Sequence, residues 1–127
     1  MRINSEREAV ITRQLVAYSI VLGGLLLPFL ADAKHEVEII LKDHLFYPAQ
    51  IEVPAHKKIK LIIRNQDNTP EEFDSFDLNR EKVIFANRAA SIFIGPLQPG
   101  EYHFFGEYSP NTAQGVVIAV EPKKEQP

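Results

Sequence analysis

Short runs in which apolar residues occupy every second position are the feature that most constrains the fold of this chain. Ile59, Leu61 and Ile63 recur at this spacing, which is the period of a strand with one face in a core. Similar runs follow one another after residue 34, and none keeps a helical period for long. The pattern predicts an all-β domain.

Turn-forming segments separate these runs. Residues 65–70 read NQDNTP and residues 97–100 read LQPG, and both are rich in the residue types that favour turns. Roughly eight short strands at this spacing are typical of two antiparallel sheets packed together. We therefore predict a two-sheet Greek-key sandwich, followed by a frayed polar tail at residues 121–127.

The first 33 residues have the composition of a secretory signal. Arg2, Arg7 and Arg13 give the N-terminal segment a positive charge. An apolar run covers residues 15–30, and residues 31–33 (ADA) fit a small-residue cleavage site. The apolar run is shorter than the about 20 residues of a membrane-spanning helix. We expect residues 1–33 to be a helical signal peptide and residues 34–127 to be one exported domain. The alternative is an uncleaved N-terminal anchor, which would be the only membrane contact.

Composition excludes several classes of function. The chain has no cysteine, so it has neither a disulfide nor a thiol nucleophile. Its net charge is −3, and its short basic pairs, Lys57-Lys58 and Lys123-Lys124, do not form a nucleic-acid surface. It contains no glycine-rich phosphate loop, no Gly-x-Ser-x-Gly and no His-Glu-x-x-His. We expect that it is not an enzyme and does not bind nucleic acid.

Three segments, in order, resemble the cupredoxin-like domain. Residues 46–55 (FYPAQIEVPA) match the opening pattern F-x-P-x-x-I-x-V-x-A, and residues 70–74 (PEEFD) lie where such proteins place their first metal ligand. Residues 97–102 (LQPGEY) then lead to residues 114–117 (QGVV). This resemblance implies that residues 34–127 form a cupredoxin-like domain.

Within that family the chain is similar to domains found with bacterial periplasmic ferrous-iron uptake systems. Glu72 stands where blue-copper proteins have their upstream histidine, and residues 104–108 (FFGEY) resemble stand-alone accessory proteins of those systems. The resemblance implies a periplasmic accessory protein that binds copper, as Cu(II), or iron. Its implied partners are an iron permease or other components of the uptake system.

The last hairpin departs from electron-transfer cupredoxins, which carry a cysteine, a histidine and often a methionine there. These positions fall at Gly106, near Ser109, and near Ala113 or Gln114. None of these residues replaces the missing ligand, so the resemblance does not extend to a blue-copper site.

His44, Glu72 and Glu107 are the main candidate metal ligands. His44 ends the first strand region, at about the position of a potential ligand in the related domains. Glu107 follows Gly106 in the last loop, so it could meet His44 and Glu72 at one end of the sandwich. Imidazole and carboxylate ligands suit Cu(II) and iron, whereas Cu(I) prefers sulfur.

Asp74 and His103 are secondary candidates. Asp74 shares a strand face with Glu72, while Phe73 between them should face the core. His103 lies on the strand face opposite Tyr102. The alternatives are that the acidic run is a solvated edge strand and that His103 is packed or solvent-facing.

A second class of function is a metal-free module that binds a protein partner. In this reading the sandwich has lost its metal site, and aromatic residues near one end form a docking patch. The candidates for that patch are Phe46, Tyr47, Phe104, Phe105 and Tyr108.

Overall fold

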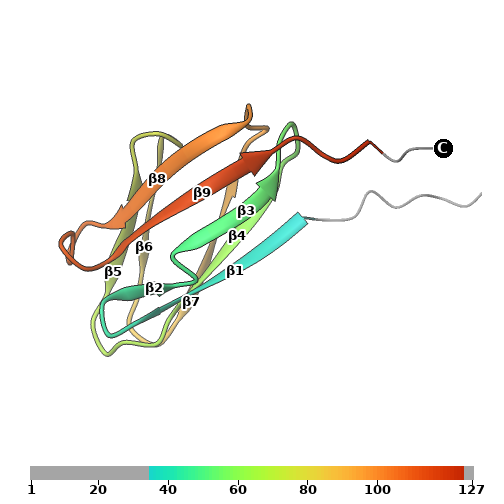
Figure 1. The fold of residues 1–127 in the computed structure, drawn as a ribbon. Helices are drawn as coiled ribbons and strands as arrows, with labels where there is room; N and C mark the ends of the chain where they lie inside the picture. The colour runs from blue at the N-terminus through green and yellow to red at the C-terminus, as the bar shows by residue number, and fades with distance from the viewer. Residues whose placement is uncertain (1–34, 125–127) are drawn as a thin grey trace, which may run out of the picture. The chain divides into compact units, whose positions relative to one another are not determined.

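The computed structural model describes residues 35–124 as two β-sheets that form a sandwich (Figure 1). The strands are β1 (His35–Lys42), β2 (Leu45–Tyr47), β3 (Gln50–Pro54), β4 (Ile59–Asn65), β5 (Glu71–Ser75), β6 (Arg80–Ile84), β7 (Ala89–Ile94), β8 (Gly100–Gly106) and β9 (Gln114–Val120). The predicted all-β sandwich is confirmed. The predicted signal helix of residues 1–33 lies outside the described residues.

Helices play no part in residues 35–124. A search of this part of the chain for an apolar helix of membrane-spanning length therefore finds none.

The chain crosses between the two sheets as it builds them. One sheet has the order β2-β1-β4-β7 and the other has the order β3-β9-β8-β5-β6. β1 pairs with β4, and β3 with β9, in parallel; parallel neighbours require such crossover connections. The remaining pairs are antiparallel. The first strand, β1, therefore lies in one sheet, and the last strand, β9, lies in the other sheet of the sandwich.

The apolar face that the period-two pattern predicts is the core. Ile59, Leu61 and Ile63 of β4 are fully buried, and the inward residues of the facing sheet pack with them in one cluster. Phe73 and Phe104 stack with ring centroids 5.1 Å apart, and Phe46 meets Phe104 edge-on at 5.2 Å. Phe46 belongs to β2, a three-residue strand that is too short to show a period of its own.

β5 covers Glu71–Ser75 and alternates buried with partly buried residues. Its first, third and fifth residues are buried, and the two between them, Glu72 and Asp74, are only partly buried. Phe73 therefore faces the core as predicted, and Glu71 shares its inward face.

Candidate functional site

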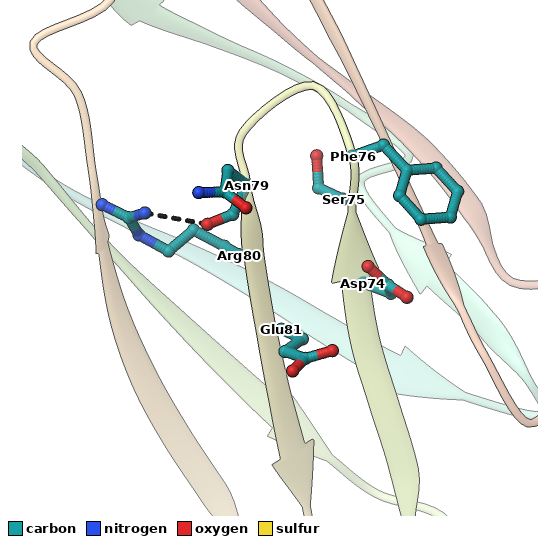
Figure 2. A pocket seen from close by; sticks show the side chains of 6 residues that line it. All are labelled: Asp74, Ser75, Phe76, Asn79, Arg80 and Glu81. Atoms are coloured by element: carbon teal, nitrogen blue, oxygen red, sulfur yellow. Dashed lines mark hydrogen bonds between the residues drawn. The ribbon is translucent and has the colours of Figure 1, made fainter.

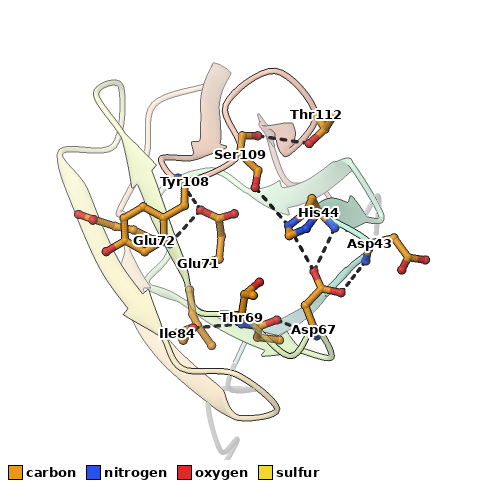
Figure 3. Close-up of polar contacts among 11 residues, drawn as sticks. Asp43, His44, Asp67, Thr69, Glu71, Glu72, Ile84, Tyr108, Ser109 and Thr112 are labelled. Atoms are coloured by element: carbon orange, nitrogen blue, oxygen red, sulfur yellow. Dashed lines mark hydrogen bonds and ion pairs between the residues drawn. The ribbon is translucent and has the colours of Figure 1, made fainter.

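Three connections meet at one end of the sandwich, which we call the loop pole. They are the β1–β2 turn (residues 43–44), the β4–β5 loop (residues 66–70) and the β8–β9 loop (residues 107–113) (Figure 3). Hydrogen bonds run from the β4–β5 loop to the β1–β2 turn, and from the β8–β9 loop to that turn and to β5. Segments distant in sequence thus converge where the candidate ligand His44 lies.

The β1–β2 turn holds His44 in a defined place. Asp43 and His44 both have positive φ, 52° and 58°, as a two-residue type I′ hairpin turn requires. Asp67 accepts both backbone N–H groups of this turn, from Asp43 at 2.7 Å and from His44 at 3.0 Å. The imidazole Nδ1 lies 3.2 Å from Ser109 Oγ and 3.8 Å from Asp67 Oδ2. Asp67 is therefore the residue that positions His44.

Glu71 places a buried carboxylate at the same pole. It is 1% exposed, and its Oε1 accepts the backbone N–H groups of Glu72 at 3.0 Å and Tyr108 at 2.8 Å. The other oxygen, Oε2, is buried and has no hydrogen-bond partner among the described residues. In Figure 3 it lies on the side of the carboxylate that faces His44. Consecutive residues of the β8–β9 loop, Tyr108 and Ser109, contact Glu71 and His44 respectively.

Glu72, the predicted β5 ligand, is directed away from the interior. It is partly buried, and the period-two rule places its side chain opposite that of Glu71. Its carbonyl accepts the backbone N–H of Glu107 at 2.8 Å, and its carboxylate is among the groups that raise the pKa of the Tyr108 phenol. A ligand to a metal ion between the sheets must point inward, so Glu71 is better placed than Glu72.

Tyr108 has a perturbed phenol because of these neighbours. Partial desolvation of the ring, followed by the negative charge and hydrogen bond of Glu72, raises its pKa above the usual 10.0. Glu71 and Glu107 add to this effect. The outer rim of the loop pole is therefore strongly acidic.

Of the other predicted ligands, Glu107 is exposed in the β8–β9 loop, at the same pole as His44. Asp74 lines a shallow pocket at the β5–β6 turn (Figure 2), and the exposed His103 lies near the same turn, where its N–H donates to Asp77 at 2.8 Å. Residues 35–124 contain no group of three His, Asp or Glu side chains that could hold a metal ion. The structure thus brings His44, Glu72 and Glu107 to one pole, together with Glu71. It does not group the predicted ligands closely enough to hold a metal ion, and their metal binding stays a prediction.

Sequence reasoning missed Glu71, although a signal for it was present. Phe73 was expected to face the core, and the period of two then places Glu71 on the same face. The acidic run of residues 71–77 concealed this, because such runs are usually solvated.

The aromatic residues that were proposed to form a docking patch lie partly in the core and partly on the surface. Phe46 and Phe104 are 3% and 2% exposed, so they pack inside and cannot dock a partner. Tyr47 and Tyr108 are about half exposed, at 49% and 54%. Phe105 is partly buried and packs against the exposed Phe76 with ring centroids 5.5 Å apart.

The chain belongs to the cupredoxin-like domain family, whose model matches residues 15–119. An uncharacterized protein of Rickettsia prowazekii (strain Madrid E) is 49% identical over 83 residues. That alignment covers 65% of this chain and 66% of the relative, so just under two thirds of the relative's length is matched.

Several solved structures share the fold, among them a blue copper protein. Auracyanin A of Chloroflexus aurantiacus superposes with a TM-score of 0.60 at 10% identity, over 69% of this chain and all (100%) of that protein. Amicyanin of Paracoccus versutus gives 0.52 at 15% identity, over 71% and 83% of the two chains. The metal-binding domain of a Cu(I)-exporting P-type ATPase of Streptococcus pneumoniae gives 0.58 at 16%, over 68% and 85%.

A blue-copper centre does not fit the residues of this chain. The chain has no cysteine, and its one methionine is Met1, so sulfur ligands are missing from the domain. Gly106 lies in contact with the Glu71 side chain, so the position of the cysteine is occupied by neighbouring atoms. What the loop pole offers is one imidazole and one inward carboxylate, which suit borderline or hard cations.

Proposed function

We propose that this cupredoxin-like domain is a periplasmic accessory protein of a bacterial iron-uptake system, and that it binds Cu(II) or iron at the loop pole through nitrogen and oxygen ligands. The observation that carries the metal-binding part of the proposal is the buried Oε2 of Glu71, which has no hydrogen-bond partner within residues 35–124, at the pole that also bears His44. Burying a carboxylate oxygen without a partner costs free energy. A bound cation would supply the missing interaction.

His44 and Glu71 are the residues that would hold the ion. Cu(II) and iron accept mixed imidazole and carboxylate ligands, with water at the remaining positions. If the ion is copper, Cu(II) would accept one electron from Fe(II), giving Cu(I) and Fe(III). If the ion is iron, the protein would carry it to a permease.

Titration of the purified protein with Cu(II), and separately with Fe(II), tests metal binding. We expect one equivalent of Cu(II) with a pale colour and an electron paramagnetic resonance spectrum of nitrogen and oxygen ligands. His44→Ala and Glu71→Gln should each weaken binding about tenfold or more. Asp74→Asn is the matched control, because Asp74 is at the other end of β5, and it should bind as the wild type does.

Two results would contradict this proposal. One is the absence of stoichiometric binding of either metal. The other is undiminished binding after His44→Ala and Glu71→Gln are combined, because the ion would then be held elsewhere.

The uptake role and the location have their own tests. We expect deletion of the gene to slow ferrous-iron uptake by intact cells, and expression of the wild-type chain to restore it. Mass spectrometry of the protein from the periplasmic fraction should show a chain that begins after residue 33. A chain that keeps residues 1–33 and sediments with membranes would instead support the anchored alternative.

A metal-free interaction module is the second candidate function. The half-exposed rings of Tyr47 and Tyr108 favour it, because exposed tyrosines are common anchors of protein interfaces. If it holds, Tyr47→Ser with Tyr108→Ser abolishes iron uptake while His44→Ala with Glu71→Gln leaves uptake intact. The opposite pattern would favour the metal-binding function.

A further inference from the structure

Gly106, the last residue of β8, leaves the space that the Glu71 side chain fills. A Cβ atom added at Gly106 would lie 2.6 Å from Glu71 Cδ and 2.9 Å from Glu71 Oε1. It would also lie 2.8 Å from the Cβ of Ala113. These separations are well inside van der Waals contact, so any side chain at position 106 competes with the carboxylate for the same volume.

The backbone of Gly106 is held in place and does not itself need glycine. Its N–H donates to the carbonyl of Ala113 at 2.8 Å, and its carbonyl accepts the N–H of Ser109 at 3.1 Å. It pairs with Phe73 of β5. Gly95 and Gly100 have positive φ, but Gly106 does not. The reason for glycine at this position is therefore the missing side chain and not backbone freedom.

Glu71 is equally fixed. Its Oε1 receives two backbone N–H groups, one of them from the β8–β9 loop that follows Gly106, and its side chain is buried. Rotation away from Gly106 would break both hydrogen bonds and leave their donors unpaired at a buried site. Neither Gly106 nor the Glu71 side chain can therefore move out of this contact without losing hydrogen bonds.

We infer that Glu71 and Gly106 are a matched pair that sets the ligand chemistry of the loop pole. The carboxylate from β5 takes the volume that a β8 side chain would need, so the pole offers oxygen and has no room for a thiolate at position 106. The steric half of this inference stands alone. Its consequence, selection of Cu(II) or iron over Cu(I), rests on the proposed function.

A double-mutant cycle on folding stability tests the steric half. Gly106→Ala should lower the folding equilibrium constant about tenfold or more in the wild-type background, since overpacking a buried site strains it. In the Glu71→Ala background the same change should cost several-fold less. In the Glu71→Gln background, which keeps the volume, it should cost as much as in the wild type.

Gly95→Ala is the matched control. Its Cβ would lie 2.6 Å from the Lys57 carbonyl oxygen, at a φ of 82°, just after the end of β7 that is remote from the loop pole. It should be costly by the same factor with or without Glu71. An equal cost of Gly106→Ala in the wild-type and Glu71→Ala backgrounds would overturn the pairing.

Binding of Cu(I), supplied with ascorbate under nitrogen, tests the consequence for metal choice. The Glu71→Ala/Gly106→Cys double variant should bind Cu(I) about tenfold or more tightly than the wild type and than Gly106→Cys alone. Equal Cu(I) affinity of Gly106→Cys and the double variant would overturn the inference that Glu71 excludes a Cu(I) ligand at position 106. If the wild type binds no Cu(II) while the stability cycle shows coupling, the proposed function fails and the matched pair stands.

Discussion

The two ends of β5 carry the same arrangement with different outcomes. Each end has an inward, buried polar residue, Glu71 at the first position and Ser75 at the last, both 1% exposed. Ser75 Oγ donates to the carbonyl of His103 at 2.7 Å and accepts the N–H of Leu78 at 3.1 Å. Glu71 has one oxygen with two donors and one with none among the described residues.

The difference separates a structural group from a candidate ligand. At the Ser75 end the buried hydroxyl both donates and accepts a hydrogen bond. The adjoining pocket is a shallow hollow over the β5–β6 turn, where Arg80 donates to the carbonyl of Asn79 (Figure 2). At the Glu71 end one acceptor, Oε2, has no partner in the part of the chain that the structure describes. Burial of a polar group by itself therefore does not mark a candidate ligand, whereas a buried acceptor without a protein partner calls for an explanation such as a bound ion.

Truncation at the Glu71 end should have the largest effect. We expect Glu71→Ala to lower the free energy of unfolding by about 2 kcal/mol or more, because it opens a cavity and leaves the N–H groups of Glu72 and Tyr108 without their acceptor. Urea denaturation measures this change. A variant as stable as the wild type would show that the carboxylate does not brace the loop pole.

Truncation at the Ser75 end should cost less and leave metal binding alone. Ser75→Ala removes two hydrogen bonds of a small side chain, so we expect a loss of about 1–1.5 kcal/mol with unchanged Cu(II) affinity. Ser91→Ala, on the exposed face of β7, is the control and should lie within about 0.5 kcal/mol of the wild type. A large loss of Cu(II) affinity in Ser75→Ala would remove the distinction between the two ends.

Glycine substitutions in two turns, β1–β2 near Glu71 and β5–β6 near Ser75, can separate the effect of backbone conformation from that of the side chain. His44 and Asn79 both have positive φ, 58° and 51°. We expect His44→Gly and Asn79→Gly each to change stability by less than about 0.5 kcal/mol, because relief of strain offsets the greater entropy of the unfolded chain. Calorimetric titration should then show weakened Cu(II) binding for His44→Gly alone. Weakening in both variants would point to a global change.

The smallest effect concerns the rim of the loop pole. Because the pKa of Tyr108 is raised in the folded protein, the folded state holds this proton more tightly than the unfolded state. The resulting stability is complete below pH 10.0 and is lost as pH rises through the folded pKa. Ultraviolet titration should show one late tyrosine, which Tyr108→Phe removes and Glu72→Gln shifts downward. An unshifted titration in Glu72→Gln would exclude that carboxylate as a cause.

Particular residues show how far sequence reasoning reached. Alternation in β4 identified the core face, Phe73 was placed inward correctly, and His44 was correctly expected at a strand end. The resemblance to blue-copper proteins pointed to Glu72 as the ligand position. The period of two, counted back from the inward Phe73, instead places Glu71 on the inward face of β5. Asp67, which accepts two N–H groups of the β1–β2 turn, had no sequence signal, because its partners are more than 20 residues away.

The sequence by itself determined the sandwich, the identity of its core face and the absence of sulfur ligands. Periodicity and composition can be read without knowing which segments become neighbours in the fold. Only the tertiary structure decided that one oxygen of Glu71 has no partner among residues 35–124, that Asp67 binds the backbone of His44, and that Gly106 makes room for a carboxylate. These facts depend on which strands and loops become neighbours. Hydrogen-bond partners and free volume are properties of that neighbourhood and not of any one segment.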